Sequence, residues 1–144
     1  MIRRLVVLGA ASLALSACAD EAPGEGAQVQ DASPEVEARA VRVGISGPDL
    51  DACAGYGVVS EVPPEGHSVH SAPSSDATEV DRIANEQGVT ICEMSGAWLG
   101  VVYSQGGDAE VDCETSSPVA NVQDYIGPCR SGWVRDGAVE FVAG

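Results

Sequence analysis

The chain has 144 residues, enough for one small domain rather than two, with 22 acidic residues against 7 arginines and no lysine. A net charge of −15 repels phosphate backbones and anionic lipid head groups, which argues against nucleic-acid binding and against adsorption to a membrane by charge. Only 4% of residues are aromatic, whereas glycine and proline are frequent, and this composition favours a turn-rich β domain over a helical bundle.

The first eighteen residues have the pattern of an export signal. A basic start at residues 1–4 precedes an apolar run at 5–15, which is too short to span a bilayer. The run ends in Leu15-Ser16-Ala17-Cys18, which resembles the bacterial lipobox. The alternative is an ordinary signal peptide that happens to end near a cysteine.

The lipobox resemblance implies that residues 1–17 are removed and that Cys18 carries three acyl chains. Two lipid signals suffice for stable anchoring, so we expect permanent attachment to a membrane. Alanine rather than aspartate at position 19 implies the outer membrane of a double-membrane bacterium, with the protein facing the periplasm. Residues 18–40 are rich in Ala, Glu, Pro and Gly and predict a flexible acidic tether.

The rest of the chain, residues 41–144, predicts several short strands. We expect strands at 41–45 and 56–62 with a turn at 48–54, then a strand from 67 that ends at Pro73. Residues 77–85 predict a loop whose Val80 and Ile83 point inward. A hairpin over 88–104 follows, then a long excursion over 108–128 and two closing strands at 132–134 and 139–142.

The hairpin has apolar residues on both faces. With a turn at Ser95-Gly96, one face would carry positions 90, 92, 94, 99, 101 and 103, and the other would carry positions 89, 91, 98 and 102. Both faces must therefore be covered by other parts of the chain.

These segments occur in a recognisable order. The runs VHSAPS (69–74), GVTIC (88–92), SGAWLGVV (95–102), SGWV (131–134) and VEFV (139–142) together resemble the bacterial SH3 domain, SH3b, over residues 69–142. The resemblance implies an all-β fold: a small SH3-like barrel at 41–144 with its core at about 67–142, an N-terminal extension and a long inserted loop. The expected core residues are Val69, Val80, Ile83, Val89, Ile91, Val101, Trp133, Val134, Val139 and Phe141.

Four cysteines remain after Cys18. An exported domain with an even cysteine count predicts two disulfides, and four cysteines allow three pairings. We favour Cys113 with Cys129, which would close the excursion, and Cys53 with Cys92, which would join the extension to the hairpin. Zinc is the alternative, but the chain has no C-x-x-C pair.

Side chains that could carry chemistry are few. Acidic residues alternate from 108 to 114, but an EF-hand-like loop starting there would have cysteine where glycine is required, so a solvated acidic face is expected rather than a calcium site. His67 and His70 would point to opposite faces of a strand, and no G-x-S-x-G motif occurs. We expect no metal, no cofactor and no catalytic nucleophile–base pair.

The remaining candidates are aromatic. SH3-like grooves hold extended peptides with such side chains, so the candidate ligand-binding residues are Trp98, Tyr103, Tyr125 and Trp133, of which Trp98 and Tyr125 are expected to be exposed. The expected function is a lipid-anchored binding or adaptor module for peptidoglycan peptides or an envelope protein. The alternatives are a cell-wall-modifying enzyme or accessory, and a structural or inhibitory lipoprotein.

Overall fold

A computed structural model describes residues 34–108 and 110–144, so the leader, Cys18 and the tether up to residue 33 lie outside the described residues. In these ranges the chain is all-β, as the sequence predicted, with two short 3-10 helices (Gln105–Gly107 and Asp136–Ala138). The strands are β1 (Arg42–Val43), β2 (Gly55–Val59), β3 (His67–His70), β4 (Glu79–Ile83), β5 (Gly88–Ser95), β6 (Trp98–Tyr103), β7 (Gln123–Asp124), β8 (Arg130–Arg135) and β9 (Val139–Ala143). No helix among these residues is long and apolar enough to cross a membrane.

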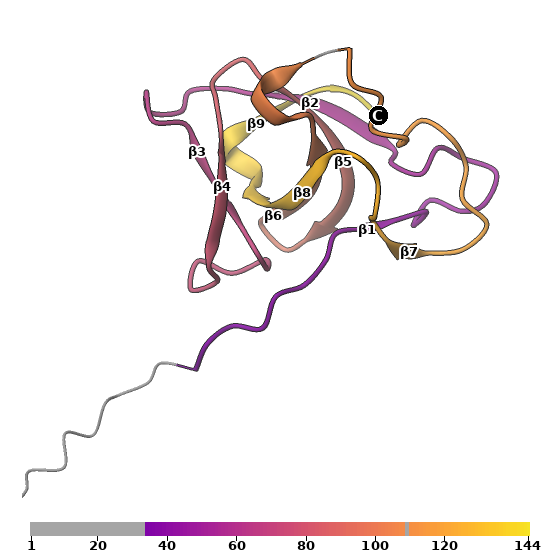
Figure 1. Cartoon of the computed structure of the whole chain (residues 1–144), viewed down its shortest axis with the longest axis horizontal. Helices are drawn as coiled ribbons and strands as arrows, with labels where there is room; N and C mark the ends of the chain where they lie inside the picture. The colour runs from indigo at the N-terminus through magenta and orange to yellow at the C-terminus, as the bar shows by residue number, and fades with distance from the viewer. Residues whose placement is uncertain (1–33, 109) are drawn as a thin grey trace, which may run out of the picture. The chain divides into compact units, whose positions relative to one another are not determined.

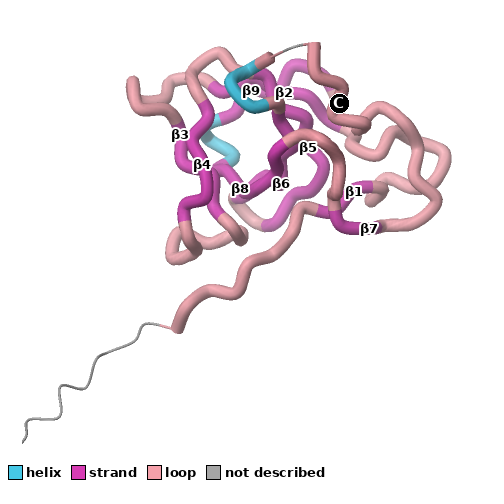
Figure 2. The backbone as a smooth tube through the Cα atoms, viewed as in Figure 1, coloured by secondary structure: helices cyan, strands magenta, loops and turns pink. Residues whose placement is uncertain are grey.

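Seven strands form one sheet in the order β4-β3-β8-β6-β5-β2-β9 (Figure 1), and every neighbouring pair in it is antiparallel. The two outermost strands, β4 and β9, do not pair with each other among the described residues, so the pairing does not close into a barrel. β1 and β7 form a separate two-stranded ribbon beside this sheet (Figure 2), which brings the N-terminal extension and the excursion together.

The β5–β6 hairpin lies at the centre of the sheet, but its register differs from the expected one. The two-residue turn is Gly96-Ala97, with Gly96 at φ 61°, and Ser95 pairs with Trp98. A register shift between Ile91 and Glu93 marks a β-bulge on β5. The expected facing of positions 98 to 103 was therefore wrong, since a slip of one residue moves each side chain to the opposite face.

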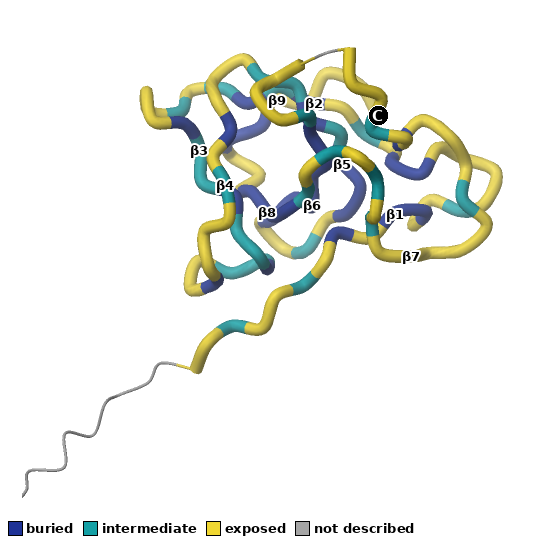
Figure 3. The backbone as a smooth tube through the Cα atoms, in the orientation of Figure 1, coloured by how far each residue is buried: buried dark blue, intermediate teal, exposed yellow. Residues whose placement is uncertain are grey.

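Two hydrophobic clusters cover the two faces of the hairpin. The inner face carries Val59, Val69, Ile83, Val89, Ile91, Leu99, Val101, Tyr103, Val134 and Val139. The outer face carries Val41, Val43, Ala52, Cys53, Cys92, Trp98, Val102 and Trp133. The outer cluster contains residues of the N-terminal extension, and Cys113, Val119, Tyr125 and Cys129 of the excursion pack against it. The two added segments thus complete the core, and Figure 3 shows buried positions gathered on the central strands.

Two of the expected core residues are exposed. The segment predicted as a loop at 77–85 contains strand β4, in which Ile83 is buried, whereas Val80 lies at a register shift in the β3–β4 pairing and is 47% exposed. Phe141 alternates with Val139 onto the inner face, but it lies on the outermost strand and is 53% exposed. The other eight expected core residues are buried.

Gly57 determines how closely β9 approaches β2. It pairs with Phe141, and a Cβ at Gly57 would lie 2.5 Å from Val139 Cγ1 and 2.8 Å from the backbone oxygen of Glu140. Only glycine therefore allows β9 to pack at this distance.

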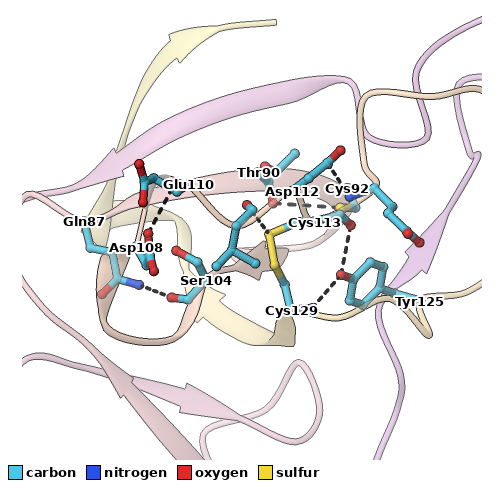
Figure 4. Close-up of a disulfide and its surroundings, with 12 residues drawn as sticks. Gln87, Thr90, Cys92, Ser104, Asp108, Glu110, Asp112, Cys113, Tyr125 and Cys129 are labelled. Carbon is cyan, nitrogen blue, oxygen red and sulfur yellow. Dashed lines mark hydrogen bonds between the residues drawn. A yellow bond between two sulfur atoms is a disulfide. The ribbon is translucent and has the colours of Figure 1, made fainter.

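Both favoured disulfides are present. Cys53–Cys92 joins the extension to β5, and Cys113–Cys129 closes the excursion. Figure 4 shows the second bridge beside Tyr125, whose hydroxyl donates to the Cys113 carbonyl oxygen at 2.9 Å and accepts from the Cys129 N–H at 3.1 Å. The phenol and the bridge therefore hold both ends of the excursion, which has little secondary structure of its own.

Candidate binding pocket

The two tryptophans expected to bind ligand are buried. Trp133 is 0% exposed, and its Nε1–H donates to the Arg39 carbonyl oxygen at 2.7 Å. Trp98 is 7% exposed, so the expectation of an exposed Trp98 was wrong. Its ring packs edge-on against His70, with ring centroids 5.1 Å apart, and the Arg135 guanidinium lies 4.4 Å from its centroid. Both indole rings are therefore part of the hydrophobic cluster on the outer face.

The two tyrosines are also engaged within the fold. Tyr103 is 3% exposed on the inner face, and its hydroxyl donates to Asp81 Oδ2 at 3.0 Å. Burial, this hydrogen bond and the charge of Asp81 raise the pKa of Tyr103. Tyr125 is partly buried, and burial raises its pKa as well. Neither hydroxyl is free for a ligand, although one edge of Tyr125 lines a small hollow with Ile126 and Gly127.

A larger pocket opens at one end of the inner face. Its volume is about 500 Å³, within the range of small-molecule and peptide side-chain sites. Ile91 and Gly55 contribute from the paired strands β5 and β2, and Phe141 contributes from β9. Met94 and Ile45, which are 66% and 45% exposed, also line it. Such a concentration of exposed apolar side chains around a hollow is typical of a binding site.

Gly55 lines this pocket from β2 without a side chain. It pairs with Ile91 across the β2–β5 ladder, and a Cβ at this position would lie 3.3 Å from Ile91 Cβ. A larger side chain there would fill the space between β5 and β9. Glycine at this position therefore leaves space in the pocket for a ligand.

The charged residues beside the pocket are already paired. Glu93 is 5% exposed and accepts hydrogen bonds from the Arg42 backbone N–H at 3.1 Å, from Arg42 Nη2 at 2.6 Å and from Arg39 Nη2. Burial alone would raise the pKa of Glu93, but the hydrogen bonds from Arg42 and the charges of both arginines hold it below its usual range. The carboxylate thus fastens the extension to β5 and is not a proton donor or acceptor near neutral pH.

The other candidate groups are spread over the surface. The acidic positions 108–114 lie in irregular chain, where the Asp108 and Asp112 carboxylates accept from the N–H groups two residues further on. Among the described residues, no three His, Cys, Asp or Glu side chains converge in a way that could hold a metal ion. His70 Nδ1 lies 3.0 Å from the Ala77 carbonyl oxygen, and His67 Nε2 accepts from the Arg135 N–H at 3.4 Å.

Sequence reasoning missed the residues that line the pocket. Phe141 was assigned to the core, and Ile45, Arg42 and Met94 were given no role. Strand alternation correctly places Phe141 on the inner face, but nothing in the local pattern shows that its strand is the last in the sheet. Comparison of the chain with protein-family models, with curated proteins and with solved structures finds no match.

Proposed function

We propose that the protein is an outer-membrane lipoprotein facing the periplasm, whose SH3-like domain is a binding module for a peptide of the peptidoglycan or of an envelope protein. The single observation that carries the binding role is the pocket of about 500 Å³, lined by the exposed side chains Phe141, Met94 and Ile45. Among the described residues, the charged side chains that line it are Arg42 and Glu93, which are paired with each other, so the pocket offers apolar contact rather than acid–base chemistry.

Two features support the envelope location. The sequence at residues 15–18 has a small-residue lipobox pattern that ends in Cys18. The four other cysteines form two disulfides, and such bonds persist in oxidising compartments such as the periplasm. Together they favour export followed by lipid attachment. Labelled palmitate incorporated by the wild-type chain, but not by Cys18→Ala, is the expected result.

The order of strands and motifs supports the SH3-like assignment at the level of fold class. The described chain is an all-β sheet of antiparallel strands that packs a core on each face of the β5–β6 hairpin. The extension and the excursion cover the outer face, on which Trp98 and Trp133 lie. The proposed ligand site is therefore the pocket at the end of the inner face, in place of the aromatic residues of the outer face.

Retention on purified cell-wall sacculi tests the binding role. We expect protein that starts at residue 19, without the leader and Cys18, to be retained, and Phe141→Ser to weaken retention about tenfold, as truncation of an interface anchor commonly does. Val80→Ser is the matched control, because Val80 is a similarly exposed apolar residue on the opposite edge strand. Crosslinking in intact cells addresses an envelope-protein ligand. No retention on sacculi and no Phe141-dependent crosslink would reject the proposal.

A further inference from the structure

The outermost strand β9 is exposed along most of its length. Residues 140–143 are all exposed, including Phe141 at 53% and Val142 at 62%. β9 pairs with β2 on one side and ends the sheet on the other. A strand in this position presents unpaired N–H and C=O groups on its free side, which form a template for another strand.

The opposite edge of the sheet differs in its chemistry. β4 carries Glu79, Asp81 and Arg82 among its five residues, and Glu79 and Arg82 form an ion pair at 2.8 Å. Charged residues on an edge strand oppose pairing with a further strand. β9 carries one charge, Glu140, beside two large apolar side chains. Of the two edges, β9 is therefore the one suited to accept a partner.

The binding pocket lies next to this edge. Phe141 is on the inner face and lines the pocket, whereas Glu140 alternates onto the other face. In a strand added beside β9, the side chain opposite Phe141 would lie about 5 Å from it, on the side of Phe141 away from β2, and would contact the residue that forms one wall of the pocket. The neighbouring side chain of the added strand would lie opposite Glu140.

We propose that an extended segment of a partner protein adds to the sheet along β9, with an apolar side chain against Phe141 at the edge of the pocket and a lysine or arginine beside Glu140. This inference rests on the proposed binding function and names its ligand class. Strand addition uses main-chain hydrogen bonds for affinity and alternate side-chain pockets for specificity, and β9 with its pocket offers both.

The negative net charge of the domain favours a basic partner. Residues 34–144 contain five arginines and eighteen acidic residues, a net charge of −13 with neutral histidines. Four of these arginines already contact carboxylates, and the fifth, Arg135, lies over Trp98. A second copy of the chain would bring another −13 to the same edge, and like charges across an interface oppose association. A basic segment is complementary in both sign and position.

Fluorescence anisotropy with a synthetic peptide tests this proposal on protein that starts at residue 19, without the leader and Cys18. The probe is a short labelled peptide in which lysine alternates with leucine and valine. One control peptide replaces lysine with glutamate. Two further control peptides methylate the backbone nitrogens of one edge or of the other, which removes the strand hydrogen bonds of that edge and leaves the side chains intact. We expect the lysine peptide to bind, and we expect the glutamate peptide and one of the two methylated peptides, the one methylated on the edge that faces β9, to bind about tenfold more weakly or worse.

Variants on the two edges locate the site. Glu140→Lys is expected to reverse the preference from the lysine peptide to the glutamate peptide, because the side-chain pair changes sign. Glu79→Lys, the matched change on β4, is expected to keep the preference for lysine. Phe141→Ser should weaken binding about tenfold, and bound peptide should slow amide hydrogen exchange at residues 140–143.

Three results with the purified protein would overturn the proposal: equal binding of the lysine and glutamate peptides, an equal effect of Glu79→Lys and Glu140→Lys, or a dimer of the free protein that Glu140→Lys dissociates. Retention on sacculi that Phe141→Ser and Glu140→Lys leave unchanged would reject strand addition but not a wall-binding function. Peptide binding without any sacculus or envelope-protein partner would support the edge site and reject the proposed function.

Discussion

Glu93→Gln is the substitution that best tests how the N-terminal extension is held. Glu93 lies on β5 with its side chain 3% exposed, and it accepts hydrogen bonds from Arg39 and Arg42, which precede and begin β1. Glutamine has almost the same shape but no charge, and it can still accept one or two of these bonds. The variant therefore removes the ion pairs without creating a cavity.

The expected cost follows from the burial of the three partners. Removing one member of a buried ion pair commonly costs about 3–5 kcal/mol, because the remaining charge is stranded. Here the arginine side chains are 38% and 47% exposed and recover water when the carboxylate is lost. We therefore expect a loss of about 2 kcal/mol at neutral pH, which for a domain of this size lowers Tm by about 10 °C.

The difference in stability between wild type and Glu93→Gln should depend on pH in a defined direction. The folded-state pKa of Glu93 lies below its usual range, so its stabilising contribution is present above the unfolded pKa of about 4.3 and is lost as pH falls through the folded value. Urea unfolding of wild type and Glu93→Gln should differ at neutral pH and converge only as pH falls below the lowered folded pKa of Glu93. The control is Glu79→Gln, whose ion pair with Arg82 is exposed and screened by solvent, so its loss should change stability much less. A Glu93→Gln deficit that matched the control, or that persisted unchanged in acid, would refute this reasoning.

Three further predictions concern packing and ionisation. Gly57→Ala should destabilise the domain by about 1–3 kcal/mol and speed amide exchange along β9, whereas Gly137→Ala, which meets no atom within 4 Å, should be neutral or slightly stabilising in the same urea and exchange measurements. Replacing Cys53 and Cys92 together by alanine should cost about 4 kcal/mol in urea unfolding, because their bridge closes a loop of 39 residues. In an alkaline absorbance titration, Tyr103→Phe should remove a phenolate signal that wild type shows only well above the usual tyrosine range, and an unchanged curve would contradict the buried hydroxyl.

Strand positions could be predicted where the local pattern was strong. The hairpin at β5 and β6, the strand before Pro73 and the closing strands were all identified from β-branched residues bounded by glycine and proline. Both cysteine pairings agree with the structure, and each joins segments that a small domain with little secondary structure in its loops has to tie down. β4 was missed because its sequence, EVDRI, is mostly charged, and pairing with β3 outweighs that low propensity.

The facing of the hairpin residues could not be predicted, for a physical reason. A register is normally fixed by one buried and one solvated face, but here both faces are buried, so a slip by one residue leaves the hydrophobic pattern equally satisfied. The bulge near Cys92 adds a further residue to one strand and gives no separate signal in the sequence. The pocket was missed for a related reason, because it depends on strand order, and strand order depends on contacts far apart in the chain.

The two buried faces of the hairpin differ in how completely they are covered, and this difference explains where the candidate site lies. On the outer face, Trp98 and Trp133 pack in one cluster with Val41 and Val43 of the N-terminal extension. The ion pairs of Glu93 and the Cys53–Cys92 disulfide hold the extension against this face. Opening that face would break a disulfide-linked core. On the inner face, the sheet ends at β9 with Phe141 half exposed over a pocket, so a ligand can bind there without displacing any packed side chain. The free-energy cost of rearranging the protein for a ligand is therefore lowest at the β9 end of the inner face. The positions of the aromatic residues in the sequence do not by themselves indicate the site in this domain.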